Sequence, residues 1–94
     1  MNRGTWKAFE LKIAKALGGQ RNPLSGKNSK HTAGDVIHPE LYVEVKLKSR
    51  IPFWNDWTKA KENAKKEGKF PILVFRKKGE TGAVAMLPFE EIIE

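Results

Sequence analysis

Two charged residues, Glu44 and Lys46, lie inside the short apolar segment 41–47. The alternation of residue types there predicts a β-strand, in which residues i and i+2 point to the same face, so the carboxylate and the ammonium emerge side by side. Tyr42 shares their face, and the aliphatic residues fill the other. The pair is either a surface ion pair or part of a polar site, and other acids in the chain favour the site.

Two of these acids, Asp35 and Glu10, stand where they can join Glu44. Asp35 opens the preceding expected strand, and a tight turn at Pro39-Glu40 predicts a hairpin that brings it close to Glu44. Two neighbouring carboxylates repel each other unless a cation or a shared proton joins them. Glu10 lies at the edge of the buried face of a helix, where a lone acid would ordinarily pair with a surface lysine.

The residue types in this set match the needs of phosphodiester hydrolysis. Carboxylate oxygens suit Mg²⁺ or Mn²⁺ rather than zinc, and such an ion polarises a phosphodiester and lowers the pKa of bound water. Lys46, beside Glu44, can hold or deprotonate the attacking water, or neutralise charge that builds on the phosphate. We therefore expect a metal-dependent phosphodiesterase site.

The distribution of charge points to a polyanionic partner. All 18 Lys and Arg residues lie in residues 1–79 with 7 acids, a net charge of +11, whereas residues 80–94 hold four Glu and carry −4. A basic body of this kind attracts nucleic acid, although it would also serve solubility or a heat-adapted surface. We expect nucleic-acid binding.

Length and composition exclude several other classes. Ninety-four residues with 39% hydrophobic and 31% charged side chains predict one globular domain, residues 1–94. The absence of cysteine excludes disulfides, thiolate zinc sites and cysteine nucleophiles. No apolar run approaches the roughly 18 residues of a membrane helix, and no signal peptide is visible. We expect a cytoplasmic protein, in the host cytoplasm if it is viral, with no membrane partner.

Hydrophobic spacing predicts the elements that position the site. A stripe of Trp6, Phe9, Ile13 and Leu17 indicates an amphipathic helix over residues 5–17, begun by Thr5 and ended by Gly18-Gly19. The chain then allows a short strand at 20–22, strands at 35–38 and 41–48, a helix from Asn55 to Glu67, strands at 70–76 and 83–87, and a helical turn after Pro88. The core order is αβββαβ, followed by one more strand.

Three parts of the chain together resemble the PD-(D/E)XK nuclease pattern of a helix acid, a strand acid and E-x-K on the next strand. They are Glu10, Gly34-Asp35 and Glu44-Val45-Lys46. The likeness extends over about residues 3–87 to archaeal and phage Holliday-junction resolvases of this superfamily, through Arg21, Ser25-Gly26, the strand 71–76 and the lysine-rich second helix. Gly34 departs from the pattern, which has proline at that position.

The resemblance implies an α/β fold with a restriction-endonuclease-like core, a small mixed sheet flanked by helices. It implies metal ligation by Asp35, Glu44 and the backbone carbonyl of Val45, with Lys46 as the catalytic lysine. Glu10 would act on a metal directly or through water. The cofactor would be Mg²⁺, with Mn²⁺ able to substitute. The activity would be DNA cleavage, at branched or junction structures, by a homodimer whose two-fold symmetry matches a four-way junction.

A further group of polar and basic residues is expected to contact the DNA backbone. These residues are Arg21, Ser25, Lys27, Lys30, His31, Lys48 and Arg50, with Asn28 and Ser29 in the same loop. Each could instead belong to a solvated surface. Trp6 and Trp57 are expected to pack internally, and Trp54 to serve the core or an interface rather than a base.

Two other functions fit the same residues. The first is a nicking, flap or repair nuclease of the same fold. The second is a non-catalytic nucleic-acid-binding protein, which the close carboxylates disfavour because they repel phosphate.

Overall fold

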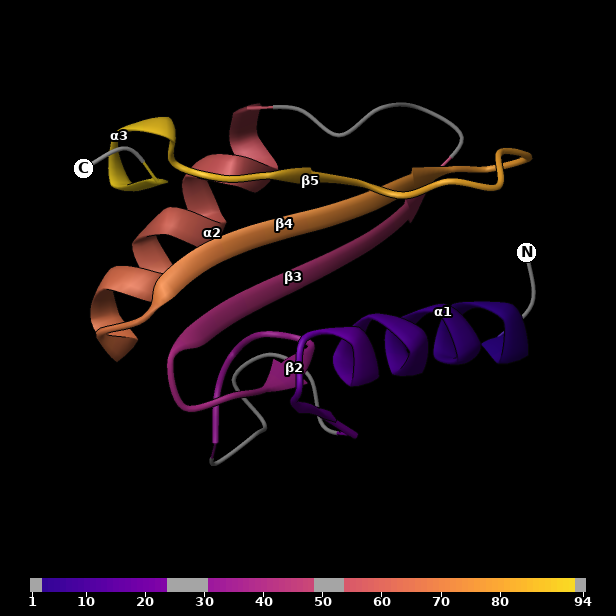
Figure 1. Cartoon of the computed structure of the whole chain (residues 1–94), viewed down its shortest axis with the longest axis horizontal. Helices are drawn as coiled ribbons and strands as arrows, with labels where there is room; N and C mark the ends of the chain where they lie inside the picture. Colours follow the sequence, from indigo (N-terminus) through magenta and orange to yellow (C-terminus); the bar gives the residue numbers. More distant parts are fainter. Residues whose placement is uncertain (1–2, 24–30, 49–53, 93–94) are drawn as a thin grey trace.

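Two helices cover the two faces of a five-stranded sheet in the computed structural model, which describes residues 3–23, 31–48 and 54–92 (Figure 1). The elements in chain order are α1 Arg3–Ala16, β1 Gln20–Arg21, β2 Val36–Ile37, β3 Leu41–Lys48, α2 Trp54–Glu67, β4 Phe70–Lys77, β5 Val84–Met86 and α3 Phe89–Ile92. The predicted small mixed α/β domain is confirmed, including the helical turn after Pro88.

The sheet is mixed because α2 carries the chain back after β3. Strand β4 therefore begins at the same end of the sheet as β3 and runs parallel to it. The strands lie in the order β1-β2-β3-β4-β5, and neighbours are antiparallel except β3 and β4. Two parallel neighbouring strands need a long crossover connection, and the 14-residue helix α2 provides it. The turn between β2 and β3 is closed by His38, whose Nδ1 accepts the backbone N–H groups of Glu40 and Leu41 at 3.0 and 3.1 Å. The predicted hairpin is therefore confirmed.

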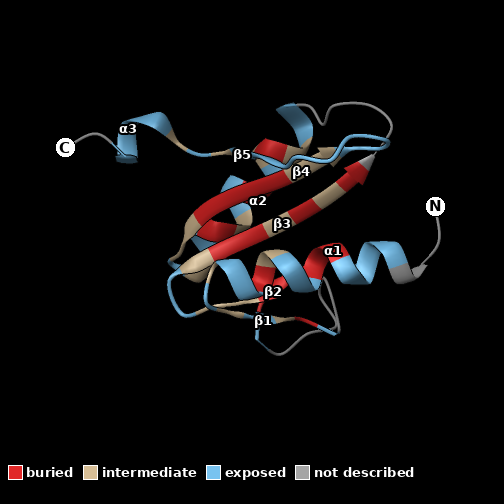
Figure 2. Ribbon diagram, turned by 45° about the vertical axis from the view of Figure 1, so that its right-hand side comes forward, coloured by how far each residue is buried: buried red, intermediate tan, exposed pale blue. Residues whose placement is uncertain are grey.

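Alternate residues of β3 point to opposite faces, as predicted, and they serve two separate cores, of which only the aliphatic one was expected. Val43, Val45 and Leu47 pack on the α1 side, in a cluster with Phe9 and Ala14 of α1. Tyr42 packs on the α2 side, in a second cluster with Trp57, Ala60, Ala64 and Leu73. Figure 2 shows that burial concentrates on β3, β4 and the helix faces against them, whereas β5 and α3 are exposed.

Glycines end both long helices, as expected. Gly18 and Gly68 have φ angles of 76° and 66°, and the following residues donate N–H groups to Ala14 and Ala64, each at 2.9 Å. The predicted first residues of these two helices are wrong by one or two positions. Helix α1 already includes Thr5 and α2 already includes Asn55, so neither residue precedes the first helical turn as a cap must.

The three tryptophans occupy different environments. Trp57 is buried and packs internally, as predicted. Trp54 is 66% exposed, so it does not belong to the core, and an interface role for it stays a prediction. Trp6 is 39% exposed, which corrects its place in the core stripe: the first turn of α1 extends beyond the short strand β2, so the sheet does not cover it there (Figure 1). Among the described residues, no helix is long and apolar enough to cross a membrane.

Candidate active site

The pairing of β2 with β3 places two of the predicted acids side by side. Val36 lies opposite Val43, and both belong to the core on the α1 side. Because side chains alternate along a strand, the flanking residues Asp35 and Glu44 meet on the opposite face. The backbone N–H of Asp35 donates to the Val43 carbonyl at 2.8 Å, which extends the pairing to this point. The expected approach of these two carboxylates is confirmed.

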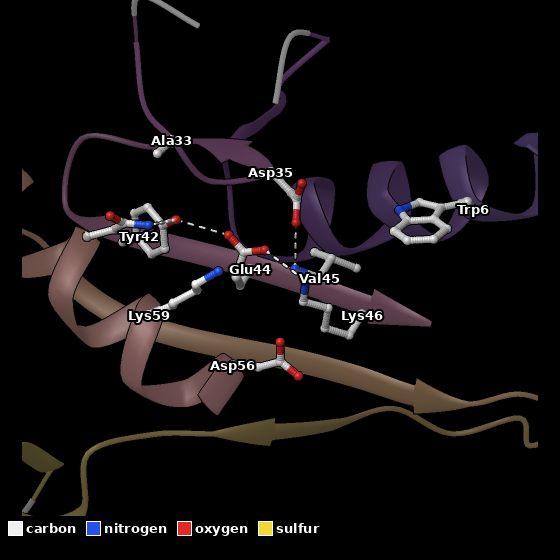
Figure 3. Close-up of a pocket in the computed structure, with 10 residues that line it drawn as sticks. Trp6, Ala33, Asp35, Tyr42, Glu44, Val45, Lys46, Asp56 and Lys59 are labelled. Atoms are coloured by element: carbon white, nitrogen blue, oxygen red, sulfur yellow. Dashed lines mark hydrogen bonds and ion pairs between the residues drawn. The ribbon is translucent and has the colours of Figure 1, made fainter. Parts of the chain in front are cut away.

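A pocket of about 530 Å³ opens in front of the two carboxylates (Figure 3). Its lining comes from the β2–β3 region with Ala33, Asp35, Tyr42, Glu44, Val45 and Lys46, from α2 with Asp56, Lys59 and Asn63, and from α1 with Trp6. Three of the four predicted catalytic residues therefore share one pocket: Asp35, Glu44 and Lys46.

Asp35 is held in a position that disfavours its charged form. It is 8% exposed, and its Oδ2 accepts the backbone N–H of Val45 at 2.7 Å. Burial and, next, the negative charge of Glu44 raise the pKa of Asp35 to about 7, although the Val45 hydrogen bond and the Lys46 ammonium oppose the shift. Near neutral pH a cation between the two carboxylates would relieve this repulsion.

Glu44 is held by one neighbour on each oxygen. The Tyr42 hydroxyl donates to Oε1 at 2.9 Å, and Lys46 Nζ lies 3.5 Å from Oε2. Burial, followed by the charge of Glu44, raises the pKa of the Tyr42 phenol well above its ordinary value, so the hydroxyl stays protonated and remains a donor. Lys46 thus lies beside the predicted ligand, as expected for an E-x-K pair.

Glu10 is buried next to this site but does not line the pocket. Trp6 Nε1–H donates to its Oε2 at 2.7 Å, and Arg21 Nε–H donates to its Oε1 at 2.9 Å. The carboxylate therefore has a partner on each oxygen, while its charge still contributes to the raised pKa of Asp35. A direct metal ligand role for Glu10 would require these bonds to rearrange.

The pair of carboxylates fits a hard divalent cation by the chemistry of its donors. Within residues 3–23, 31–48 and 54–92, no three His, Cys, Asp or Glu side chains form a group that could hold a metal ion. Mg²⁺, however, usually takes only one or two protein carboxylates and keeps water or phosphate at its other positions. Asp35 and Glu44 meet that need, with the Val45 carbonyl as the implied third ligand.

The segment before Asp35 is fixed by two side chains, those of Asn22, which follows β1, and of Glu67 in α2. Asn22 Nδ2 donates to the carbonyls of Thr32 and Gly34 at 3.1 and 2.9 Å. Glu67, the last residue of α2, accepts the Thr32 hydroxyl at 2.6 Å and the Ala33 N–H at 2.9 Å. These bonds determine where β2 begins, and therefore where the Asp35 carboxylate enters the pocket.

Gly34 suits this segment better than a proline, as in the PD-(D/E)XK pattern, would. A Cβ at this position would lie 2.8 Å from the Val43 carbonyl oxygen and 3.3 Å from the Tyr42 ring. The Gly34 N–H also donates to Thr32 Oγ1 at 3.1 Å, a bond that proline cannot make. Local packing therefore explains the departure from the pattern.

Gly34→Ala is expected to lower the free energy of unfolding by about 1–3 kcal/mol, because the added methyl group forces the backbones of β2 and β3 apart. Urea denaturation of the purified protein measures the loss. Gly82→Ala is the matched control, since a Cβ at Gly82 meets nothing within 4 Å. Equal stability of the two variants would contradict the close packing at Gly34.

The structure places only part of the predicted DNA-contact group. Arg21 pairs with Glu10, His31 is exposed, and Lys48 is the last residue of β3. Ser25, Lys27, Asn28, Ser29, Lys30 and Arg50 lie outside the described residues. Their contacts with DNA stay predictions.

The α2 side of the pocket was not predicted from the sequence. Asp56, Lys59 and Asn63 follow one another at spacings of three and four, so they form one stripe along the helix. This stripe runs directly beside the buried stripe of Trp57, Ala60 and Ala64. A polar stripe at the margin of a buried helix face is the signal that could have found them.

Comparison of the chain with protein-family models, with curated proteins and with solved structures finds no match.

Proposed function

We propose that this chain is a Mg²⁺-dependent endodeoxyribonuclease with a restriction-endonuclease-like core of the PD-(D/E)XK kind. The observation that carries the proposal is the meeting of Asp35 and Glu44 across β2 and β3, with Lys46 in the same pocket. The repulsion that raises the pKa of Asp35 gives this site a reason to bind a cation. The mixed sheet between two helices is compatible with such a core.

Asp35, Glu44 and the Val45 carbonyl would hold Mg²⁺, or Mn²⁺ in its place. The bound ion would supply Lewis-acid activation of the phosphodiester and of a water molecule. Asp35 is oriented for this by the Val45 N–H, and Glu44 by the Tyr42 hydroxyl. Glu10 would act on the site through its charge, or through water, while it stays bonded to Trp6 and Arg21.

Lys46 is the residue best placed to handle the nucleophile or the phosphate. Its ammonium lies 3.5 Å from Glu44 and is partly exposed to the pocket, with 23% of its side chain accessible. It can therefore orient a water molecule at the pocket mouth, or neutralise charge that develops on a phosphate oxygen. A second ammonium, that of Lys59, reaches the same space from α2 (Figure 3).

Branched DNA is the substrate class we propose, cleaved by a homodimer. The basic body supplies affinity for the phosphate backbone, and contacts to phosphate read shape rather than base sequence. A two-fold dimer would present two sites to the two symmetric strands of a junction. Such an activity belongs to DNA recombination and repair.

A cleavage assay with labelled junction, flap and linear duplex DNA tests this function. We expect cutting of the junction with Mg²⁺ or Mn²⁺ and none with EDTA. Preferential cutting of the flap would instead support a nicking, flap or repair nuclease of the same fold. Binding without cutting under every metal would overturn the enzyme and leave a nucleic-acid-binding protein.

DNA affinity should fall steeply with salt, because basic residues that neutralise phosphates release counterions. We expect the dissociation constant for junction DNA in EDTA to rise at least about tenfold between about 50 and about 200 mM salt. Fluorescence anisotropy at several salt concentrations measures the slope. A flat response would contradict the role given to the basic body.

A further inference from the structure

A chain of two hydrogen bonds connects α2 to the carboxylate of Glu44. The Tyr42 hydroxyl donates to Glu44 Oε1 at 2.9 Å, and Asn63 Nδ2 donates to the Tyr42 oxygen at 3.0 Å. Tyr42 lies on β3 with no exposed surface, whereas Asn63 lies on the pocket-lining stripe of α2. The three groups therefore belong to the wall of the proposed metal site.

The direction of these bonds is determined by both neighbours of the hydroxyl, since the Glu44 carboxylate can only accept and the Asn63 amide nitrogen can only donate. A side-chain amide nitrogen carries two protons and donates only. The Tyr42 oxygen must accept from it, so the single phenolic proton is left for Glu44 Oε1. Without Asn63 the hydroxyl could rotate about its C–O bond, and its proton would point toward Glu44 for only part of the time.

The Glu44 side chain needs such a constraint. It is 20% exposed at the pocket mouth, and a glutamate at such a position has several rotamers to choose from. The Tyr42 ring cannot move, because it is enclosed in the cluster of Trp57, Ala60 and Ala64. A bond from a fixed donor therefore restricts where the carboxylate can point.

We propose that Asn63 and Tyr42 are positioning residues that hold Oε1 of Glu44, so that Oε2, which lies 3.5 Å from Lys46 Nζ, is presented to a divalent cation beside Asp35. This inference rests on the proposed function, since it concerns the same metal. It assigns roles to a tyrosine and an asparagine that the E-x-K pattern does not include. It also makes α2, and not only the sheet, part of the metal-binding apparatus.

Asn63→Asp is the sharpest test, because the new carboxylate would accept the Tyr42 proton and take it away from Glu44. We expect the Mg²⁺ concentration for half-maximal junction cleavage to rise by about tenfold or more, as is usual when a group that orients a metal ligand is lost. Tyr42→Phe, which removes the donor, should act in the same direction. DNA affinity in EDTA should change less than twofold for Tyr42→Phe.

Asn55→Asp is the matched control. It makes the same change of charge in the first turn of the same helix, at an exposed position outside the pocket lining. We expect its metal dependence to equal that of the unmodified protein. Circular dichroism checks that each variant is folded. If Tyr42→Phe does not fold, Asn63→Asp, at a half-buried position, still tests the proposal.

A second readout does not depend on cleavage. Tyr42 is the only tyrosine in the chain, so a ¹³C label at the tyrosine Cζ alone gives one resonance. Mg²⁺ should shift this resonance in the unmodified protein and leave it unchanged in Glu44→Gln. If the unmodified protein shows neither a shift nor cleavage, the proposed function fails. If it shows both, but Asn63→Asp and Tyr42→Phe keep the original metal dependence, only the positioning role is overturned.

Discussion

Asp35→Asn should lower the rate of Mg²⁺-dependent junction cleavage by about a thousandfold or more. The amide keeps the shape of the side chain and can still accept the Val45 N–H, so the fold around β2 is preserved. It removes the negative charge that the pocket offers to a divalent cation, and with it the metal-assisted stabilisation of the transition state. Single-turnover cleavage with excess enzyme measures the loss.

Binding should respond in the opposite way. Asp35 faces the space where a phosphate would lie, so loss of its charge should leave the affinity for junction DNA in EDTA equal or higher. Glu62→Gln is the control, because it removes one acid from the exposed surface of α2, away from the pocket. Cleavage at the normal rate by Asp35→Asn would disprove the ligand assignment.

The stability of the metal-free protein should depend on pH through the same carboxyl group. The pKa of Asp35 is about 7 in the folded chain, against an ordinary value of 3.8. The folded state therefore holds the proton more tightly than the unfolded state. The contribution of the protonated Asp35 carboxyl to the free energy of unfolding is complete below about pH 4 and is lost as the pH rises through about 7. The difference between the two pKa values limits this loss of unfolding free energy to roughly 4 kcal/mol.

Urea denaturation of the protein and of Asp35→Asn at pH values from about 4 to about 8 isolates this effect. The asparagine variant cannot ionise, so the difference in unfolding free energy between the two proteins should shift in favour of the variant as the pH rises. Mg²⁺ at the upper pH should stabilise the unmodified protein and not the variant. A difference that stays constant across this range would show that Asp35 is not destabilised when ionised.

The sequence was most informative where a short-range rule determines geometry. Strand β3 could be predicted from its alternation, and the meeting of Asp35 with Glu44 from a hairpin too short to allow another register. The environment of Glu10 could not be predicted, because its partner Arg21 lies on a two-residue strand whose position depends on the packing of α1.

The buried face of α2 could be predicted, because Trp57, Ala60 and Ala64 recur at helical spacing and are the buried residues of this helix, but the part that its neighbouring stripe plays in the pocket could not. A turn of the helix by one residue would move the stripe of Asp56, Lys59 and Asn63 into the position of the buried stripe. Only the packing of Trp57 in its cluster decides between these two arrangements. The side chains of the pocket wall thus depend on contacts between elements far apart in the chain.

Helix α2 touches both halves of the site, which has a mechanical consequence. Its last residue, Glu67, bonds to the segment that leads into Asp35, and Asn63 one turn earlier bonds to Tyr42 beside Glu44. The two carboxylates are thus tied to neighbouring turns of a single helix as well as to paired strands. A displacement of one carboxylate relative to the other would therefore have to break hydrogen bonds to α2 as well as the pairing of β2 with β3.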